Sequence, residues 1–406
     1  MEHIVVSHIM KHTQINNILY HFQHGFRNKR SCETQLLEFI DDVAKNMENG
    51  IQTDLCILDF AKAFDKVGHK RLLEKLKWYG IDGVTNRWIE QLLTGRTQSV
   101  VLDGISSDSE SVLSGVPQGS VLAPCLFLLY INDIADNLQG TVRLFADDTM
   151  IYMVIRSETD AINFQKDLDM LSEWEKTWMM EFHPDKCEVI SITRKRSPIN
   201  HPYKLHGQLL KHVECTKYLG VKIAKDLRWN KHIDYVTAKA TNSLNFLRRN
   251  IQIGNSKIKS IAYQTLVRPQ LEYCQTVWDP YTQELKNKLE MVQRRAARFA
   301  LGNYAPTSSV NNMLEKLQWK SLEHRRKIAR LVMFHKIINN SVATCMTLKL
   351  NQHTHSQNSQ TYVVPYARND YYKMSFFPRT AREWNRLPND TVLLQTKEQF
   401  KEALTR

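Results

Sequence analysis

The stretch Phe145-Ala146-Asp147-Asp148-Thr149 lies in the middle of a long apolar run. Val142-Arg143-Leu144 precede it and Met150-Ile151-Tyr152 follow it, so the pattern predicts two short strands joined by a tight turn. Consecutive strand residues point to opposite faces of a sheet, so two adjacent aspartates can share one target only where the chain turns. Two neighbouring carboxylates are unfavourable without a cation between them. The stretch predicts a cation-binding hairpin tip or an ordinary polar turn, in which Asp is common.

A second acidic segment is Thr53-Asp54-Leu55-Cys56-Ile57-Leu58-Asp59, an apolar strand that ends in an aspartate. A helix-like stretch follows from about His69 to Tyr79. The C-terminal end of a strand, just before a turn into a helix, is where mixed sheets present catalytic groups. Asp59 is therefore a candidate catalytic residue, with a capping or turn role as the alternative. For Asp65 we prefer the capping or turn role.

A third segment, Gly115-Val116-Pro117-Gln118-Gly119-Ser120, is rich in turn residues. It precedes an apolar helix predicted from Val121 to about Ile134, with Pro124 tolerated in the first turn. Glycines let a backbone approach a ligand closely, and free N–H groups at a helix start favour anions. Taken alone, this segment is also compatible with a plain loop before a buried helix.

These segments carry a family resemblance. Leu58–Asp65, Gly115–Pro124 and Phe145–Asp148 resemble motifs A, B and C of the reverse transcriptases of non-LTR (LINE-type, jockey-like) retrotransposons. Further matches are His24-Gly25-Phe26-Arg27, Arg30-Ser31-Cys32, Asn132-Asp133-Ile134, His183–Cys187, Lys217–Val221 and Arg382–Pro388. The resemblance covers nearly the whole chain.

The resemblance implies an α+β fold with right-hand polymerase architecture, in which an antiparallel-sheet palm is flanked by helices. We expect partial fingers over residues 1–50, a palm with motifs A to E over 51–227, a helical thumb over 228–345, and a linker and C-terminal tail over 346–406. The linker is expected at 346–360. The endonuclease and the first finger motifs of such elements are not visible, so an N-terminally truncated copy is expected.

The implied chemistry is nucleotidyl transfer, in which a primer 3′-oxygen attacks the α-phosphate of a deoxynucleoside triphosphate. Two metal ions about 3.5–4 Å apart can neutralise the developing charge. Mg²⁺ is expected, with Mn²⁺ as an alternative, because hard cations prefer oxygen ligands. By resemblance, Asp59 and Asp147 would bridge the metals and Asp148 would be a weaker or outer ligand.

Other roles also follow from the resemblance. Phe64 would be the aromatic gate against the nucleotide sugar, with core packing as the alternative. Gln118 and Gly119 would contact the template or the nucleotide, and Lys186 would protonate the leaving pyrophosphate or be a surface lysine. The remaining assignments are Arg27 and Arg30 as template or triphosphate contacts, and Tyr218, Leu219 and Gly220 as the primer grip.

Composition predicts a polyanionic partner. The 406 residues carry a formal net charge of +13, and contacts of Lys and Arg with phosphates supply most non-specific affinity for nucleic acid. A basic protein with solvated lysines is the alternative. From about residue 228 the apolar period is helical, and we expect the basic faces of these helices to grip a primer–template. The cations are Lys286, Lys288, Arg294, Arg295, Arg298, Arg325, Arg326, Lys327 and Arg330.

The seven cysteines lack paired spacing, which predicts reduced thiols in an intracellular protein and no zinc site. They are Cys32, Cys56, Cys125, Cys187, Cys215, Cys274 and Cys345. The apolar run Leu126–Ile131 is far too short to span a bilayer, so no membrane association is expected. The family's life cycle implies a nuclear location, although Arg194-Lys195-Arg196 is too short to be a signal.

Three functions compete. The preferred one is an RNA-directed DNA polymerase that binds an RNA template, a DNA primer and deoxynucleoside triphosphates. The second is a catalytically inactive fragment that only binds nucleic acid. The third is an unrelated metal-dependent hydrolase that uses Asp59 and Asp147, for which the Pro117-Gln118-Gly119 loop has no explanation.

Overall fold

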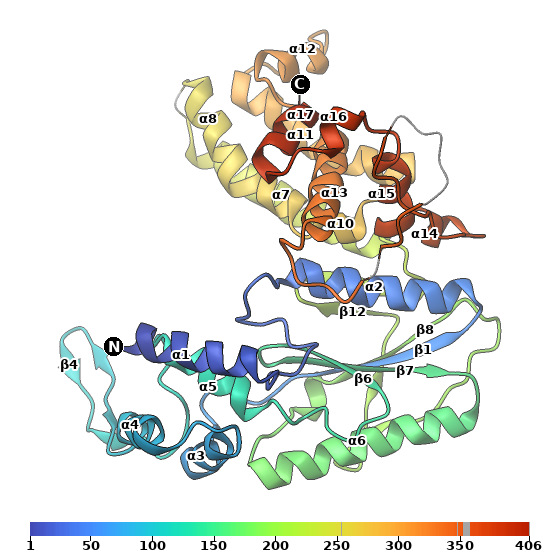
Figure 1. Cartoon of the computed structure of the whole chain (residues 1–406). Coiled ribbons are helices and arrows are strands. Elements are labelled where there is room, and N and C mark those ends of the chain that lie inside the picture. The colour runs from blue at the N-terminus through green and yellow to red at the C-terminus, as the bar shows by residue number, and fades with distance from the viewer. Residues whose placement is uncertain (253, 347, 352–357, 406) are drawn as a thin grey trace. The chain divides into compact units, whose positions relative to one another are not determined.

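The computed structural model describes residues 1–252, 254–346, 348–351 and 358–405. The chain forms two compact units (Figure 1). Unit 1 comprises Met1–Ser31 and Ile51–Glu214, and unit 2 comprises Cys32–Gly50 and Cys215–Arg406. Unit 1 contains the sheet and unit 2 is mostly helical, so the predicted α+β class is confirmed. The two units do not coincide with the four segments predicted from the sequence, and the assignment of fingers, palm and thumb stays a prediction.

A five-stranded sheet forms the centre of unit 1, in the order β11-β8-β1-β7-β6. Its strands are β1 (Gln52–Leu58), β6 (Thr141–Phe145), β7 (Asp148–Ile155), β8 (Glu188–Ile192) and β11 (Lys211–His212). Neighbouring strands are antiparallel, except that β8 and β11 are parallel. β1 lies in the middle and is buried along most of its length, which explains the apolar run of its second half. Gln52 and Asp54 in its first half are also buried, and their side chains have hydrogen-bond partners.

Helix α6 (Glu158–Trp178) lies along one face of this sheet (Figure 1). It begins at a capping box, in which Ser157 Oγ accepts from the Asp160 N–H and the Asp160 carboxylate accepts from the Ser157 N–H. Phe164 is fully buried, and Trp174 and Trp178 are partly buried against the same core. The apolar side of α6 therefore packs into the core of unit 1.

The other elements of unit 1 complete the core and an exposed ribbon. They are α1 (Glu2–Ile15), α3 (His69–Trp78), α4 (Gly83–Leu93), β2 (Thr97–Gln98), β3 (Val101–Leu102), β4 (Ile105–Ser106), β5 (Glu110–Ser111), α5 (Leu122–Tyr130), a 3₁₀ turn (Pro184–Lys186), β9 (Lys204–Leu205) and β10 (Gln208–Leu209). Residues 97–111 form the ribbon, in which β2 pairs with β5 and β3 pairs with β4. Asp103 and Gly104 both have positive φ and form the tight turn between β3 and β4.

Helix α5 is shorter than predicted. It ends at Tyr130 rather than near Ile134, because Asn132 uses its side chain elsewhere: its Oδ1 accepts from Tyr20 N at 2.7 Å and its Nδ2 donates to Ile18 O at 2.8 Å. Side chains of this type compete with helix hydrogen bonds. The motif Asn132-Asp133-Ile134 therefore joins the N-terminal segment to the core of unit 1.

Asp133 also anchors a buried lysine. Lys75 Nζ lies 2.5 Å from Asp133 Oδ1 and 3.5 Å from the centroid of the Trp178 ring. Burial lowers the pKa of Lys75 to about 8, although Asp133 acts in the opposite direction. The lysine links α3 to α6 and to the end of α5.

Unit 2 is built mainly from helices. Its elements are α2 (Cys32–Glu48), β12 (Cys215–Tyr218), β13 (Val221–Ala224), α7 (Asn230–Asn250), α8 (Ser256–Ala262), a π-helical turn (Tyr263–Val267), α9 (Arg268–Glu272), α10 (Gln275–Trp278), α11 (Gln283–Leu301), α12 (Val310–Lys316), α13 (Leu322–Ile338), α14 (Asp370–Lys373), α15 (Phe376–Trp384), α16 (Asn389–Val392) and α17 (Lys397–Thr405). The helical character predicted from about residue 228 is confirmed by α7, α11 and α13. Among the described residues, no helix has the length and apolar character needed to cross a bilayer.

A buried ion cluster in unit 2 corrects the predicted basic face of α13. Arg326 Nε donates to Asp279 Oδ1 at 2.6 Å, and Arg330 contacts the other Asp279 oxygen. Arg330 also donates to Glu383 at 2.7 Å. Arg326 and Arg330 are only 0% and 1% exposed, so they are internal residues and not nucleic-acid contacts. Buried guanidinium groups require carboxylate partners, which Asp279 and Glu383 supply.

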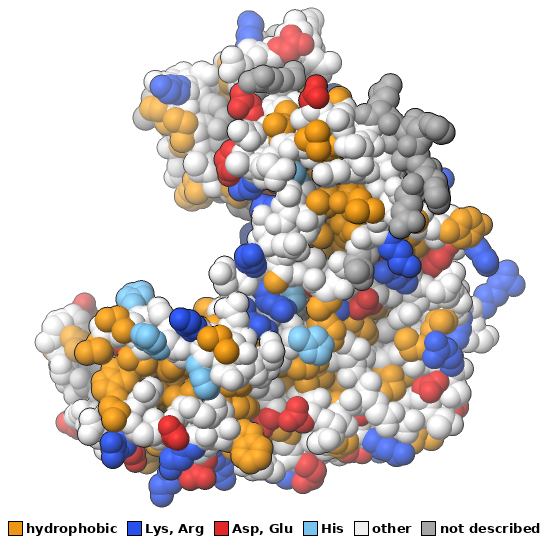
Figure 2. Space-filling view, in the orientation of Figure 1, with side chains coloured by type: hydrophobic (Ala, Val, Ile, Leu, Met, Phe, Trp, Pro, Cys, Tyr) orange, Lys and Arg blue, Asp and Glu red, His pale blue; other side chains and the backbone are white. Residues whose placement is uncertain are grey.

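Other cations of the predicted basic faces also have acidic partners. Arg325 pairs with Glu272, Lys286 with Glu323, and Lys288 with Asp234. Arg294, Arg295 and Lys327 are exposed. Figure 2 shows basic and acidic side chains interspersed on the visible surface. The predicted faces therefore stabilise packing between helices as well as carrying exposed positive charge.

The C-terminal motif Arg382–Pro388, which the sequence left without a role, is structural. Trp384 is fully buried and its Nε1 donates to Gln360 O at 2.8 Å. Asn385 accepts from Tyr362 N at 2.9 Å and donates to Tyr362 O at 2.8 Å. The motif fixes the segment around Gln360 onto unit 2. Much of the predicted linker, residues 347 and 352–357, lies outside the described residues.

We predict that Asp279→Asn lowers the free energy of unfolding by roughly 3–5 kcal/mol, because it leaves buried arginines without a compensating charge. Urea denaturation followed by tryptophan fluorescence measures the loss. The exposed Asp390→Asn is the matched control and should change the unfolding free energy by less than about 0.5 kcal/mol. Equal midpoints for the two variants would contradict a stabilising role for the cluster.

Candidate active site

Three aspartates converge at one end of the strands β1 and β7, in the middle of the unit 1 sheet. Leu58 pairs with Thr149 across β1 and β7, so Asp59 and Asp148 are the next residues at this end of the two strands. Phe145 pairs with Asp148 across β6 and β7, which places Asp147 in the turn between them. The predicted hairpin tip is therefore confirmed, and the structure brings the three predicted acids together.

The turn has an unusual backbone. Ala146 has a φ of 53°, a left-handed conformation that residues with a Cβ rarely adopt. Thr149 Oγ1 donates to Asp147 O at 3.1 Å, which ties the turn to the start of β7. The turn is thus held in a conformation that its own residues do not favour.

The carboxylates interact electrostatically. Partial burial, followed by the charges of Asp147 and Asp59, raises the pKa of Asp148 to about 6. Partial burial and the charge of Asp59 raise the pKa of Asp147 as well. Neighbouring like charges disfavour the ionised form, so a cation between these groups would relieve the repulsion.

The donor set fits hard divalent cations, since it consists of carboxylate oxygens on adjacent strands. Among the described residues, no three His, Cys, Asp or Glu side chains by themselves meet the requirements of a metal site. Mg²⁺ is commonly held by one or two carboxylates together with substrate phosphates and water, rather than by an all-protein cage. Asp59, Asp147 and Asp148 are the residues that would hold such ions.

Lys186 lies beside the first aspartate. Its Nζ is 3.7 Å from Asp59 Oδ2, and the two side chains are 58% and 48% exposed. The backbone around Asp59 is held by the segment before Lys186: His183 N donates to Asp59 O at 2.8 Å, and Ala61 N donates to Glu181 O at 2.7 Å. The lysine is therefore exposed and close to the Asp59 carboxylate, while its role as a proton donor stays a prediction.

The glycine-flanked loop is held against Asp65. Gln118 Nε2 donates to Asp65 Oδ1 at 2.7 Å, and Ser114 Oγ donates to Asp65 O at 2.8 Å. Gly115 has a φ of 89°, and a Cβ there would lie 2.9 Å from Asp65 O, so the position requires glycine. Gln118 and Gly119 are exposed. Asp65 has the structural role preferred from the sequence, and it orients the loop that carries Gln118.

The Phe64 side chain is partly buried and packs against both Phe127 and the core of unit 1. Its ring stacks on Phe127 of α5, with ring centroids 4.3 Å apart and planes inclined by 17°. The same side chain packs against the main core of unit 1. The ring is thereby fixed in orientation, which suits both the predicted sugar gate and the alternative of core packing.

Arg27 and Arg30 each donate a hydrogen bond to the backbone of the segment that precedes the His24-Gly25 motif. Arg27 Nη1 donates to Tyr20 O at 2.8 Å, and Arg30 donates to His21 O. Burial and the neighbouring Arg30 lower the pKa of Arg27 to about 10. The predicted contacts with template or triphosphate stay predictions, but both residues have a structural function in this segment.

The predicted primer grip belongs to unit 2. Leu219 and Gly220 form the turn between β12 and β13, with φ values of 43° and 81°. Leu219 O accepts from Tyr273 OH at 3.0 Å, and the buried Tyr218 OH accepts from Gln35 Nε2 at 2.5 Å. The turn is firmly anchored within its own unit, and its contact with a primer stays a prediction.

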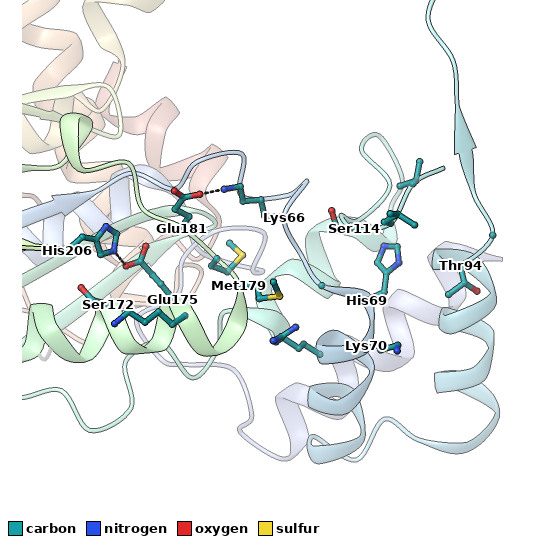
Figure 3. Close-up of a pocket in the computed structure, with 17 residues that line it drawn as sticks. Lys66, His69, Lys70, Thr94, Ser114, Ser172, Glu175, Met179, Glu181 and His206 are labelled. Atoms are coloured by element: carbon teal, nitrogen blue, oxygen red, sulfur yellow. Dashed lines mark hydrogen bonds and ion pairs between the residues drawn. The ribbon is translucent and has the colours of Figure 1, made fainter. Parts of the chain in front are cut away.

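A groove of about 1380 Å³ lies between the start of α3 and the C-terminal end of α6 (Figure 3). Lys66 pairs with Glu181, and His206 Nε2 lies 2.5 Å from Glu175 Oε2 on the same side of the groove, while His69, Ser114 and Thr94 lie on the other side (Figure 3). The three aspartates are not among its lining residues. Its lining does include Glu181, whose backbone carbonyl accepts a hydrogen bond from Ala61 N, two residues after Asp59. The groove therefore lies next to the segment that follows Asp59 and does not contain the three acids.

The sheet, the paired aspartates and the glycine-flanked loop define the class of the protein. The chain belongs to the reverse transcriptase (RNA-dependent DNA polymerase) family, whose model matches residues 1–223. This family consists of enzymes that generally use divalent metal ions. The membership expected from the sequence is confirmed.

Individual relatives are mobile-element polymerases. The chain is 25% identical over 382 residues to the RNA-directed DNA polymerase from mobile element jockey of Drosophila melanogaster, covering 87% of this chain and 41% of the relative. The jockey polymerase of Drosophila funebris is 28% identical over 315 residues, covering 73% and 34%. The jockey-like character is confirmed. The chain spans about two fifths or less of the length of these relatives.

Among solved structures, telomerase from Candida tropicalis in complex with the TWJ fragment of telomeric RNA is similar, with a TM-score of 0.46 and 10% identity. The match covers 99% of this chain and 56% of that chain. Apo telomerase from the same organism has a TM-score of 0.45, 10% identity, and coverage of 83% and 54%.

The raised pKa of Asp148 predicts a pH-dependent stability. The group ionises near its ordinary pKa in the unfolded chain and at about 6 in the folded protein, so the folded state loses stability as pH rises from about 4 to 6. Asp148→Asn removes this loss. In metal-free buffer with chelator, its Tm relative to the wild type should increase as pH rises over that range.

The exposed Asp169→Asn on α6 is the control, and its Tm difference from the wild type should not vary with pH. A pH-independent difference for Asp148→Asn would show that neither burial nor the neighbouring carboxylates raise the pKa of Asp148 in the folded protein.

Proposed function

We propose that this chain extends a DNA primer on an RNA template by nucleotidyl transfer that depends on two Mg²⁺ ions. The observation that carries the proposal is the convergence of Asp59 with Asp147 and Asp148 at one end of the inner strands β1 and β7, where Asp59 and Asp148 are exposed. These three residues would hold the metals. When bound, divalent ions would neutralise charge on the transferring phosphate. Mn²⁺ has the same preference for oxygen ligands and is the alternative.

The chain's own residues would perform the remaining tasks. Lys186 is exposed next to Asp59 and would donate a proton to the leaving pyrophosphate, a contribution of roughly 10²–10⁴ in rate. Gln118, oriented by Asp65, would contact the template or the nucleotide. Phe64, fixed by its stacking on Phe127, would exclude a 2′-hydroxyl.

Unit 2 offers a basic cavity for nucleic-acid phosphates. The cavity has a volume of about 300 Å³ and lies along α13 and α17. Four lysines line it: Lys320, Lys336, Lys397 and Lys401. Burial, followed by Lys320, Lys327 and Arg325, lowers the pKa of His324, as expected where the potential is positive. RNA template and DNA primer are the polyanions that the proposed reaction requires. Because the copies would be made into chromosomal DNA, the reaction would take place in the nucleus.

Asp147→Asn should abolish primer extension, lowering kcat by roughly three orders of magnitude or more, equivalent to about 4 kcal/mol. The substitution keeps the side-chain shape and removes the negative charge of a carboxylate that would ligate the metal. The assay is extension of a DNA primer on a homopolymeric RNA with Mg²⁺, run beside fluorescence-anisotropy measurements of template binding, which should change little.

Asp169→Asn, an exposed site on α6, is the matched control and should extend the primer like the wild type. Retained synthesis by Asp147→Asn would refute the metal-ligand role. A wild-type chain that binds the primed template without extending it would instead favour a fragment that only binds nucleic acid.

Phe64→Val should increase ribonucleotide incorporation, since a smaller side chain leaves space for the 2′-hydroxyl. The ratio of kcat/KM for a ribonucleotide to that for the matching deoxynucleotide should rise by roughly tenfold or more, about 1.4 kcal/mol. The deoxynucleotide reaction of the same variant is the internal control. An unchanged ratio would assign Phe64 to core packing alone.

A further inference from the structure

A single buried glutamine contacts the turn that carries the catalytic aspartates. Gln23 is 2% exposed, and its Oε1 accepts from Ala146 N at 3.0 Å and from Gly25 N at 2.7 Å. Its Nε2 finds no hydrogen-bond partner among the described residues. The side chain therefore acts as an acceptor, and one oxygen joins two separate backbone segments.

The backbone around Gln23 is fixed to the same strand. His24 N donates to Leu144 O at 2.8 Å, and Leu144 N donates to Phe22 O at 3.1 Å. This short parallel pairing adds the Phe22–His24 segment to the outer edge of β6. Gln23 is thus anchored on both sides by hydrogen bonds, so its amide oxygen has little freedom to move away from the turn.

The glycine after this segment permits the close approach. A Cβ at Gly25 would lie 2.2 Å from Ala146 N and 2.9 Å from the Phe145 carbonyl carbon. The contacting atoms belong to backbone and cannot move aside as a flexible side chain would. Glycine is therefore required where the segment crosses the turn.

Ala146 needs an external partner. It is 5% exposed, and its N–H faces Gln23 rather than solvent, so without that acceptor a buried donor would lose its hydrogen bond. Its φ of 53° is unfavourable for alanine. Without the Gln23 acceptor, the turn would lower its free energy by adopting another conformation. That change would rotate Asp147 away from Asp59.

We propose that Gln23 is a positioning residue for the metal-binding turn: through Ala146 it holds Asp147 and Asp148 in the orientation that faces Asp59. Gln23 itself touches no substrate. Its consequence for catalysis rests on the proposed polymerase function, whereas its effect on metal affinity does not.

The test measures binding of Mn²⁺ alone, by electron paramagnetic resonance of the free ion, without nucleotide or nucleic acid. Gln23→Met keeps a similar volume but removes the acceptor, and should weaken Mn²⁺ binding by roughly tenfold or more, as loss of outer-shell partners does. Gln23→Glu keeps an acceptor oxygen and should bind Mn²⁺ at least as tightly as the wild type.

The matched control is Gln293→Met. Gln293 is a buried glutamine of unit 2 that accepts from Tyr263 OH and donates to Lys320 O, each at 3.1 Å. This variant makes the same chemical change at a comparable burial, and should leave Mn²⁺ affinity unchanged whatever its effect on Tm. Circular dichroism confirms that each variant is folded.

Unchanged Mn²⁺ affinity in Gln23→Met would overturn the inference, as would equal weakening by Gln23→Met and Gln23→Glu, which would indicate packing alone. If Gln23→Met does not fold, Gln23→Asn replaces it with the same expectation. Its side chain is one methylene shorter, so the amide oxygen no longer reaches Ala146 N.

A second readout is primer extension, in which Gln23→Met should lower kcat while leaving KM for the deoxynucleotide within about threefold. A wild-type chain that binds Mn²⁺ but extends no primer would defeat the proposed function and leave the inference about Gln23 to the Mn²⁺ measurements.

Discussion

Repulsion among three carboxylates is the constraint on which unit 1 depends. Burial, followed by the charges of the neighbouring carboxylates, raises the pKa of Asp147 and Asp148. The surrounding structure must therefore prevent the turn from opening. The central position of β1, the pairing of β6 with β7, and the supports behind Asp59 all resist that movement. The acids with raised pKa are therefore held by many backbone hydrogen bonds, as expected where a structure keeps ionisable groups in an unfavourable environment.

The sequence predicted the parts of the site that depend on local pattern. Strand periodicity predicted β1 and the β6–β7 hairpin, and the motif resemblance predicted that Asp59 and Asp147 lie close together. Gln23 was missed as a contact of the turn, because its sequence neighbours give no sign that its amide reaches a left-handed Ala146. The available signal was the glycine at position 25. The reason that only glycine fits there becomes clear from the structure, in which the backbone of Phe145 and Ala146 lies against Gly25.

The sequence was less informative about unit 2. Helical periodicity correctly located α7, α11 and α13, but a charged residue opposite an apolar stripe was interpreted as exposed. Arg326 and Arg330 are buried because Asp279 and Glu383, from distant parts of the chain, neutralise them. Such compensation depends on tertiary contacts between side chains far apart in sequence, so no local pattern distinguishes an internal guanidinium from a solvated one.

The position of β1 also affects biosynthesis. Both of its neighbours, β7 and β8, are made by the ribosome long after β1 itself. Until Ile192 has emerged, the nascent chain has an apolar strand with at least one unpaired edge, a common starting point for aggregation. Contacts between segments so distant in sequence form slowly, so translation speed and chaperone availability should influence the yield of native protein.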